Sequence, residues 1–569
     1  MRPSGITKRG FLLGLVAITL PAIASQSPSC RCLPGDACWP STSTWNAFNQ
    51  SIDGLLMATV PLGTPCHAPN FDEEKCKAIK DGWLLPDEHY KTSSSIMAPY
   101  FGSCDPFYPS SEPCPIGNLV QYAVNVSKPE HIIKTLEFTR KYNIRFIVRN
   151  TGHDYQGKST GAGALAVWMH NLKDIEVKNW SDAHYTGKAA KLAAGVQGID
   201  AFEAAHKEGL RIVGGECPSV GLAGGYSQGG GHSALSSRYG LGADQILEWE
   251  VIDGTGRFLI ANREQNADLY WALAGGGAGT YGIVWSMTSK AHPDGVVSGL
   301  NLTFSATEIS TDTFFQAVEL YNAHLSSIVD EGVMSLNFLT NTSFTIAPMT
   351  GPDIPLRRLE SLFQPVRDGF DRLGIHYTYQ SEEFDSYLAQ FRTQQAPIEV
   401  GIAQYGGWLV PRSVVQENNS GLTESIRSVI SNGGIFTTVA INVSKRVSGD
   451  VHNAVLPAWR EAIAHVVLST SWEWDDHDYT IAAQEKMTND FMPSLMKLAP
   501  KSGAYLNEAD FRQPDFKTAF YGENYDALRQ VKAKYDPHNL FYGLTAVGSD
   551  EWTVSSSGRM CPVVSHDEL

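Results

Sequence analysis

The chain has 569 residues, of which 43% are hydrophobic and 18% are charged, and its formal net charge is −16. This length and composition fit roughly two to four globular domains and exclude a disordered or collagen-like protein. Because an acidic surface repels phosphate backbones and anionic membranes, we expect no nucleic-acid partner.

The first 24 residues have the pattern of a secretory signal peptide. Three basic residues precede the apolar run 11–20, and Ala22-Ile23-Ala24 is similar to a signal-peptidase site. Since the run is too short to cross a bilayer, we expect cleavage and no membrane span in the mature chain. A membrane anchor is the alternative interpretation.

Cysteine usage agrees with an oxidising compartment. Eight cysteines are expected to form four disulfides, whose pairing the sequence leaves open: Cys30, Cys32, Cys38, Cys66, Cys76, Cys104, Cys114 and Cys561. Cys217, between glycines, is left over. Glycosylation is expected at the N-x-S/T sequons Asn49, Asn125, Asn179, Asn301, Asn341, Asn418 and Asn442.

Hydrophobic periodicity predicts regular elements from residue 131 onward. A helix at 131–142 leads to a short strand at 144–148, which ends in the polar turn 149–153. The later elements are two helices, a strand and a strand-then-helix segment: 311–328, 356–373, 435–443 and 504–543, with its helix at 525–535.

Shifts in composition divide the chain into six parts. We predict a signal peptide, a mostly irregular Cys-rich cap, a first domain part, an inserted α+β domain, a second domain part and a tail: 1–24, 25–114, 115–294, 295–495, 496–548 and 549–569. The chain has no internal repeat.

Residues 277–282 match G-x-G-x-x-G, the dinucleotide-binding fingerprint. A working fingerprint opens a helix, whose N-terminus meets the pyrophosphate. Because the residues that follow, 283–288, have the pattern of a strand, we do not expect a Rossmann fold here.

Residues 225–229 match G-x-S-x-G and would make Ser227 the nucleophile of a serine hydrolase. Such a nucleophile needs a hydrophobic strand before it, and the glycine-rich stretch 220–224 is a poor strand. The alternative interpretation is a polar residue in a tight glycine loop.

Two other glycine-rich loops each carry one reactive side chain. His153 lies in the loop 149–157 and Cys217 in the loop 214–231. Glycines let backbone amides approach a phosphate or a flat ring without Cβ obstruction. Taken singly, each residue has an ordinary structural explanation, and their shared setting is what points to a cofactor.

The chain ends with His566-Asp567-Glu568-Leu569, a signal that the retrieval receptor of the endoplasmic reticulum recognises. With the signal peptide, this tetrapeptide predicts residence in the lumen of that compartment. Secretion is the alternative.

Three long segments resemble the berberine bridge enzyme-like branch of the vanillyl-alcohol oxidase superfamily. They are RNTGHDYQG (149–157), GGECPSVGLAGGYSQGGGHSALSSRYGLGADQI (214–246) and YDPHNLFY (535–542). The resemblance implies an α+β fold, in which a two-part FAD-binding domain of p-cresol methylhydroxylase type carries an inserted substrate domain, an antiparallel sheet covered by helices. It also implies FAD as cofactor.

Carried over by position, the family pattern implies a bicovalent flavin, with His153 on the 8α-methyl group and Cys217 on C6 of the ring. Residues expected along the remaining cofactor are Arg149, Asn150, Thr151, Gly152, Asp154, Gly221, Gly224, Gly225, Gly230, Asp244, Gly282, Val284 and Asn507. We expect no metal.

The family often takes its base from a Y-x-N-Y segment, to which Tyr505-Leu506-Asn507-Glu508 is similar. Glu508 replaces the second tyrosine, so it and Tyr505 are candidate catalytic residues. A buried carboxylate beside a flavin is expected to have a raised pKa and to serve as general base at neutral pH, whereas a surface glutamate would form a salt bridge. Asp510, expected on the same face of a strand, is the second carboxylate candidate.

Four aromatic residues of the middle domain are candidates to wall a pocket for a planar substrate: Tyr405, Trp408, Trp472 and Trp474. Such residues also pack in cores. The expected function is an FAD-linked oxidase that takes a hydride from a small secondary metabolite and passes the electrons to O₂, with possible oxidative cyclisation of an alkaloid or polyketide. A carbohydrate oxidase or dehydrogenase, a serine hydrolase using Ser227 and a flavin-binding protein without turnover are the alternatives.

Overall fold

The computed structural model describes residues 30–395, 397–474 and 476–563. The predicted signal peptide and the retrieval tetrapeptide lie outside these residues. Within the described ranges, no helix is both long and apolar enough to cross a membrane.

Two small sheets make up the first half of the architecture. One has the order β1-β2-β4-β3, with parallel pairing of β4 to both β2 and β3. The other is antiparallel, with the order β5-β6-β10-β8-β9. Their strands are β1 (Leu56–Ala58), β2 (Tyr122–Asn125), β3 (Phe146–Arg149), β4 (Leu165–Trp168), β5 (Ile175–Ser181), β6 (Thr186–Ala193), β8 (Ile246–Ile252), β9 (Phe258–Asn262) and β10 (Ile283–Lys290).

Helix α4 (Pro129–Tyr142) shows how the sequence sets up the first functional loop. Pro129 suits the first turn because its missing N–H would have no helical acceptor there. Asn143 ends the helix in the left-handed conformation at φ 49°. The chain then enters β3, whose last residue, Arg149, begins the loop that contains His153.

The other helices beside the small sheets are short. They are α5 (Gly198–Lys207), α6 (Ser236–Tyr239), α7 (Ala267–Leu273) and α16 (Tyr525–Tyr535). Residues 283–290 form strand β10, so the G-x-G-x-x-G match does not open a helix, as the sequence indicated. Strand β7 (Leu210–Arg211) pairs antiparallel with β11 (His292–Pro293) in a separate two-stranded sheet.

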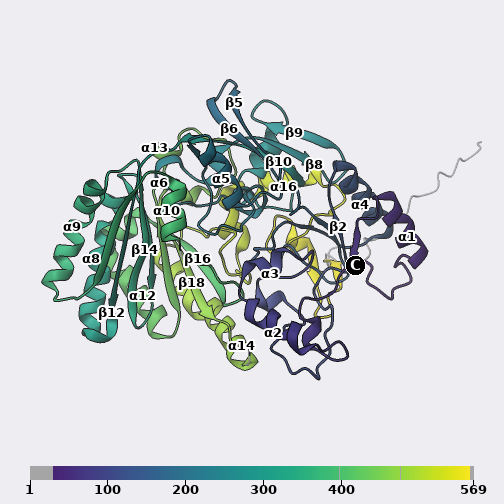
Figure 1. Cartoon of the computed structure of the whole chain (residues 1–569), viewed down its shortest axis with the longest axis horizontal. Helices are drawn as coiled ribbons and strands as arrows, with labels where there is room; N and C mark the ends of the chain where they lie inside the picture. The colour runs from purple at the N-terminus through teal and green to yellow at the C-terminus, as the bar shows by residue number, and fades with distance from the viewer. Residues whose placement is uncertain (1–29, 396, 475, 564–569) are drawn as a thin grey trace, which may run out of the picture.

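A large antiparallel sheet of seven strands forms the second half, in the order β15-β12-β14-β13-β17-β18-β16. Its strands are β12 (Val297–Ser305), β13 (Met334–Leu339), β14 (Ser343–Pro352), β15 (Thr378–Phe384), β16 (Ala403–Pro411), β17 (Ile435–Ala440) and β18 (Ala462–Ser471). Helices α8 (Thr311–Val329), α9 (Leu356–Arg372) and α12 (Asn419–Ser431) lie together on one side of it (Figure 1). The predicted α+β fold with a helix-covered antiparallel sheet is confirmed.

The remaining helices of this half connect the sheet to its surroundings: α10 (Tyr387–Gln394), α11 (Arg412–Glu417), α13 (Lys445–Ser448), α14 (His477–Lys486) and α15 (Met492–Leu498). Helix α14 projects beside the cap at the lower edge of the molecule in Figure 1.

Strand β16 separates two environments, because successive residues of a strand point to opposite faces. A Cβ atom at Gly406 would meet the sulfur atoms of Met487 and Met492, next to α15. A Cβ atom at Gly407 would lie 2.3 Å from the backbone oxygen of Glu508. Even-numbered residues of β16 therefore face the helices, and odd-numbered residues face the small-sheet half of the molecule.

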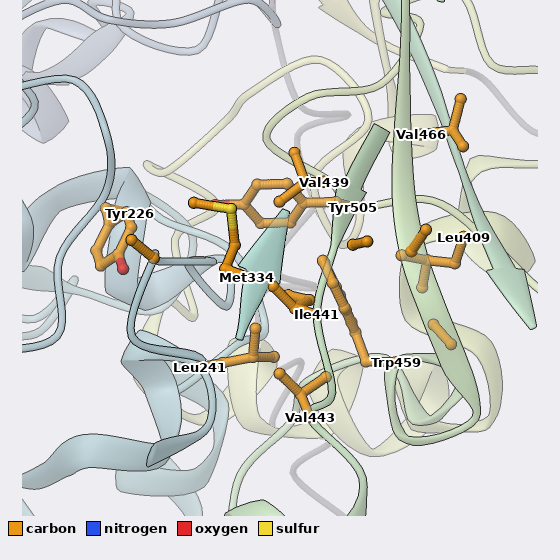
Figure 2. Packing of buried hydrophobic residues seen from close by; sticks show 14 of the residues in the cluster. Tyr226, Leu241, Met334, Leu409, Val439, Ile441, Val443, Trp459, Val466 and Tyr505 are labelled. Atoms are coloured by element: carbon orange, nitrogen blue, oxygen red, sulfur yellow. The ribbon is translucent and has the colours of Figure 1, made fainter. Parts of the chain in front are cut away.

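One hydrophobic core runs through the junction between the two halves. Tyr226 and Leu241 from the small-sheet half lie beside Met334, Val439 and Trp459 of the large-sheet half (Figure 2). Because this packing is continuous, the loops that follow the small sheets are held against one face of the large sheet.

The cap at 30–114 is less irregular than the sequence indicated. It contains helices α1 (Thr42–Ser51), α2 (Glu73–Gly82) and α3 (Pro86–Tyr90) between its disulfides. Four bridges are present, Cys30–Cys561, Cys32–Cys38, Cys66–Cys76 and Cys104–Cys114, and Cys217 is free, as predicted. Cys561 lies on β20 (Met560–Pro562), which pairs with β19 (Trp552–Val554).

The segment at 504–510 corrects one expectation. The helix α16 lies where the sequence placed it, but the residues before it form turns and irregular backbone, not a strand. The turn is closed by the N–H of Glu508, which donates to the carbonyl of Tyr505 at 3.0 Å. Here a backbone turn decides the conformation, and the β-type pattern of the side chains does not.

Trp459 offers a test of the junction. Its ring is 1% exposed and lies 5.6 Å from the rings of both His465 and Tyr505. Trp459→Ala is expected to lower the free energy of unfolding by about 3–5 kcal/mol, because it leaves a cavity. The measurement is denaturant unfolding followed by circular dichroism.

The matched control is Phe363→Ala, in the helix layer at 0% exposure. It should cost a similar amount of stability, while crystal structures show a shifted Tyr505 ring only in the Trp459 variant. An unmoved Tyr505 in that variant would contradict this account of the junction.

Candidate functional site

The loop after β3 presents a row of backbone donors. Within the described residues, the N–H groups of Thr151, Gly152, His153 and Asp154 have no protein hydrogen-bond acceptor. Gly152 has φ +89°, a conformation that L side chains rarely adopt. Consecutive N–H groups around such a glycine form a concave site for an anionic group.

Arg149 lies beneath this loop and is fully buried. Its Nη2 atom donates to the carbonyl oxygens of His89 and Thr92 in the cap, at 3.3 Å each. Its Nε and Nη1 atoms have no acceptor in the described part of the chain. Burial lowers the pKa of Arg149 to about 10, so it remains charged at neutral pH and adds positive charge under the loop.

The second loop packs on the first through glycines. A Cβ atom at Gly221 would lie 2.5 Å from the Nδ2 atom of Asn150, and one at Gly224 would lie 3.1 Å from it. The Asn150 amide also donates to the carbonyl of Ala194 at 2.5 Å. Gly225 has no neighbour within 4 Å of an added Cβ, so its surface is open. The two predicted cofactor loops are therefore neighbours in space.

His153 and Cys217 meet between these loops. The Nε2 atom of His153 lies 3.8 Å from the Sγ atom of Cys217 and 2.8 Å from the Oγ atom of Ser219. Burial, reinforced by the charge of Arg149, lowers the pKa of His153 to about 4. Burial raises the pKa of the Cys217 thiol. At neutral pH the site thus holds a neutral imidazole beside a protonated thiol.

The carboxylate of Glu508 lies between two imidazole rings. His232 Nε2 is 3.1 Å from its Oε2 atom, and His465 Nε2 donates to the same atom at 2.9 Å. Burial disfavours the charged form of Glu508, but the charge and hydrogen bonds of the two histidines outweigh it and hold its pKa well below the usual range. The structure places Glu508 as a partly buried carboxylate between two buried histidines, not in a surface salt bridge. The raised pKa expected for it is wrong, because the two histidines favour the charged form.

Tyrosine side chains surround Glu508. Tyr505 is buried, and its hydroxyl oxygen accepts from the amide of Asn507 at 2.7 Å. The Asn507 amide also donates to the carbonyl of Gly225. The rings of Tyr155 and Tyr405 lie 4.1 Å apart. Burial raises the pKa of Tyr405 to about 12 and that of Tyr155 further, so these phenols are neutral.

Asp510 does not share the position of Glu508. Because the segment is not a strand, the two side chains diverge, and the Asp510 carboxylate accepts from Thr488 Oγ1 at 2.6 Å. Asp510 is 1% exposed and does not contact the two histidines. The prediction that it shares the face of Glu508 is wrong.

Five of the residues predicted to contact the cofactor have protein partners. Asp244 forms a buried ion pair with Arg460 at 2.7 Å, which joins the two halves of the molecule. The Asp154 carboxylate accepts from the backbone of Gln156 and Ser159, so only its N–H faces the loop interior. A Cβ atom at Gly282 would meet Val251 on β8, and Val284 lies in the core. Gly230, with φ +124°, lies against Tyr505.

Of the four aromatic residues predicted to contact the substrate, two lie near the site and two do not. Tyr405 lies on the odd-numbered face of β16, next to Tyr155 of the first loop. Trp408 lies on the opposite face, where its Nε1 atom donates to the carbonyl of Ala499, so it is a core residue. Trp474 packs against Trp83 and Phe107 of the cap.

Trp472 is half-buried, and its ring lies 6.1 Å from that of Tyr100. Tyr100 donates its hydroxyl to the carbonyl of Tyr155 at 2.7 Å, so the cap contacts the site on this side. Tyr405 and Trp472 thus remain near the site, whereas Trp408 and Trp474 do not.

Sequence reasoning missed the histidines. His232 belongs to the second loop, and a titratable residue in a glycine-rich loop was a usable signal. His465 carries no such signal, because a single histidine in the apolar strand β18 looks like an ordinary core residue. Ser227 is 2% exposed and makes no hydrogen bond to a histidine among the residues described, which a serine nucleophile would need.

Comparison with known proteins agrees with this geometry. A model described as "FAD binding domain" matches residues 120–262, and one described as "Berberine and berberine like" matches residues 504–547. The FAD-linked oxidoreductase patO of Penicillium expansum is 47% identical over 557 residues, which cover 97% of each chain. This chain belongs to the berberine bridge enzyme-like family. It is therefore an FAD-linked oxidoreductase of the VAO type, as the resemblance implied.

Two further relatives extend the match. The bifunctional decalin synthase calF of Penicillium decumbens is 40% identical over 571 residues, covering 97% of this chain and 98% of the relative. The crystal structure of the VAO-type flavoprotein MtVAO615 from Myceliophthora thermophila C1 superposes with a TM-score of 0.90 at 38% identity. It covers 94% of this chain and 100% of the other.

The residues present fit FAD. Four N–H donors without protein acceptors and the unpaired donor atoms of Arg149 match an anionic pyrophosphate. The open backbone at Gly225 leaves space for the cofactor, and the neutral imidazole of His153 and the Cys217 thiol adjoin it.

Gly407 tests how tightly Glu508 is placed. Gly407→Ala would put a Cβ atom 2.3 Å from the Glu508 carbonyl oxygen, so we expect the 505–508 turn to shift. Gly406→Ala instead meets two flexible methionine side chains and should cost about 1–3 kcal/mol of stability through overpacking. Crystal structures of both variants should show Glu508 displaced only in the Gly407 variant. Equal positions of Glu508 would contradict the placement.

Proposed function

We propose that the protein is an oxidase with a bicovalently bound FAD. A hydride from a substrate C–H bond passes to the bound FAD, which is the chemistry that the cofactor supplies. The observation that carries the proposal is the 3.8 Å approach of His153 Nε2 to Cys217 Sγ between two loops that fit the rest of the cofactor. The imidazole and the thiol would hold one ring of the flavin at two positions, the methyl group on C8 and the carbon C6.

The protein must also handle a proton. Glu508 is ionised, and its carboxylate is accessible, since 27% of its side chain is exposed. We assign it the role of general base for a substrate O–H or N–H group. Tyr505 lies near Glu508. It is a neutral phenol, because burial raises its pKa far above neutral.

The substrate class follows from the walls of the site. Tyr155 and Tyr405 provide aromatic surfaces next to Glu508, which suit a planar apolar molecule. We propose a small secondary metabolite, and the decalin synthase relative makes oxidative cyclisation of a polyketide-type ring system a specific possibility to test. O₂ is the proposed final acceptor, with hydrogen peroxide as product. A carbohydrate substrate would need more hydrogen-bonding side chains than these aromatic rings provide.

We propose that the protein resides in the lumen of the endoplasmic reticulum. The basis is the N-terminal signal pattern together with the C-terminal tetrapeptide that the retrieval receptor recognises. The four disulfides agree with an oxidising compartment. Secretion stays the alternative.

Covalent attachment is tested by acid precipitation and mass spectrometry. The wild-type protein should be yellow and stay yellow after precipitation. His153→Ala and Cys217→Ala should each retain the flavin through one bond, and only the double variant should release it. His324→Ala on helix α8 is the control and should keep both bonds. A colourless wild-type protein, or complete release from both single variants, would contradict the proposal.

The two attachments should respond differently to pH. His153, with a pKa of about 4, is already neutral above about pH 6, so its attachment rate in Cys217→Ala should be flat up to about pH 9. The raised pKa of Cys217 keeps the thiol protonated, so its attachment rate in His153→Ala should rise up to about tenfold per pH unit.

The measurement incubates apoprotein with FAD, quenches samples in acid and counts attached flavin by mass spectrometry. Identical pH dependences in the two variants would show that these protonation states do not control attachment.

A further inference from the structure

Four titratable groups, two buried histidines and two partly buried glutamates, form a continuous chain, and only Glu508 among them was expected from sequence. Glu216 Oε2 lies 3.3 Å from His232 Nδ1, His232 Nε2 lies 3.1 Å from Glu508, and His465 Nε2 lies 2.9 Å from the same carboxylate. Glu216 and His232 come from the second cofactor loop, Glu508 from the 505–508 turn and His465 from β18. Three separate segments therefore supply one cluster, which hydrogen bonds join at Glu508 and an ion-pair contact joins between Glu216 and His232.

The geometry fixes the charge of each member. His232 lies between two carboxylates, with Nδ1 at an ion-pair distance of 3.3 Å from Glu216 and Nε2 at 3.1 Å from Glu508, and these two negative charges favour the imidazolium and raise its pKa despite burial. His465 donates from Nε2, and its Nδ1 atom has no partner in the described part of the chain, so it is neutral. Two carboxylates, one imidazolium and one neutral imidazole leave one net negative charge.

Among the residues that the structure describes, the surroundings contribute no compensating cation. The titratable side chains that face the cluster from the packed elements are phenols and one thiol: Tyr155, Tyr226, Tyr387, Tyr405, Tyr505 and Cys217. Burial raises the pKa of every one of these groups, so they are uncharged at neutral pH. The cluster accordingly has room to accept one proton and become neutral.

We propose that Glu216, His232, Glu508 and His465 act as one proton acceptor, in which Glu216 is the positioning residue that keeps His232 charged. This inference rests on the proposed function. As the substrate C–H bond breaks and its hydrogen leaves with two electrons for bound FAD, the substrate O–H bond breaks. Its proton forms a new O–H bond with Glu508, and a carbon–oxygen double bond remains on the product.

Glu216 matters because His232 has two possible charge states. With both carboxylates present, the imidazolium holds Glu508 in place and offsets its charge. Without the charge of Glu216, His232 loses its proton more readily, and the cluster has a lower affinity for the incoming proton. An opposite charge at this distance is worth about 1 to 3 pH units of pKa.

The direct test follows the histidine rings themselves. In protein labelled with ¹⁵N-histidine, NMR should show His232 as an imidazolium up to about pH 9 in the wild type. In Glu216→Gln this ring should lose its proton about 1 to 3 pH units lower, and Glu216→Asp should restore the wild-type titration. His232→Gln and His465→Gln identify the signals. Titration of His232 at the same pH in Glu216→Gln would overturn the proposal.

The second measurement is flavin reduction in a single anaerobic turnover, with a metabolite found by screening for flavin bleaching. At neutral pH, reduction should be slower in Glu216→Gln than in the wild type, by up to about tenfold for each unit by which the proton affinity of the cluster falls, and Glu216→Asp should restore the rate. Glu203→Gln, whose carboxylate pairs with Arg392 at the surface, is the control and should keep the wild-type rate. Mass spectrometry confirms equal flavin loading.

The outcomes separate the two proposals. Unchanged reduction in Glu508→Gln would remove the base assigned under the proposed function. Slow reduction in Glu508→Gln, combined with a wild-type rate of reduction in Glu216→Gln, would overturn only the four-residue acceptor. Loss of wild-type reduction after treatment with a chelator would show that the cluster works through a bound metal ion, and it would also overturn the proposal.

Discussion

The carboxylate of Glu508 is the constraint on which the rest of the site depends. A buried carboxylate is costly unless hydrogen bonds and opposite charge compensate it. Here the compensation comes from His232 in a loop of the small-sheet half and His465 in the large sheet. Docking of the two halves both removes Glu508 from most of the solvent and supplies the histidines that compensate its charge, so the chemistry of the site and the assembly of the halves share one requirement.

The cofactor loops also depend on charge compensation, but they present hydrogen-bond donors and positive charge instead of a carboxylate. Thr151 to Asp154 present N–H donors without protein acceptors, and Arg149 adds a positive charge below them. An anion bound here would accept these hydrogen bonds and compensate this charge. The cap contributes two carbonyl oxygens to Arg149 and a tyrosine hydroxyl to the same loop. The site thus pairs a positively charged region for the cofactor with a negatively charged region for the substrate proton.

Much of this arrangement was readable from the sequence, and the failures have physical reasons. Long ordered segments predicted the fold, the cofactor and the neighbourhood of His153 and Cys217, because glycine positions are set by close backbone contacts. The strand predicted for 504–510 failed because a local turn overrides side-chain pattern. The prediction that Trp408 walls the substrate pocket failed because the alternation of faces along β16 turns this side chain toward the helices. His465 was missed because only the pairing of distant strands brings it to Glu508.

The alternation of faces along the large sheet has a consequence for the history of this enzyme. Odd-numbered residues of β16 and their partners on β18 face the small-sheet half and Glu508, while even-numbered residues support the helix layer. A substitution in the first set therefore acts first on the surroundings of Glu508, and one in the second set acts first on the helix layer. Such a division lets related enzymes diverge toward new metabolites on one surface while purifying selection preserves a common scaffold behind it.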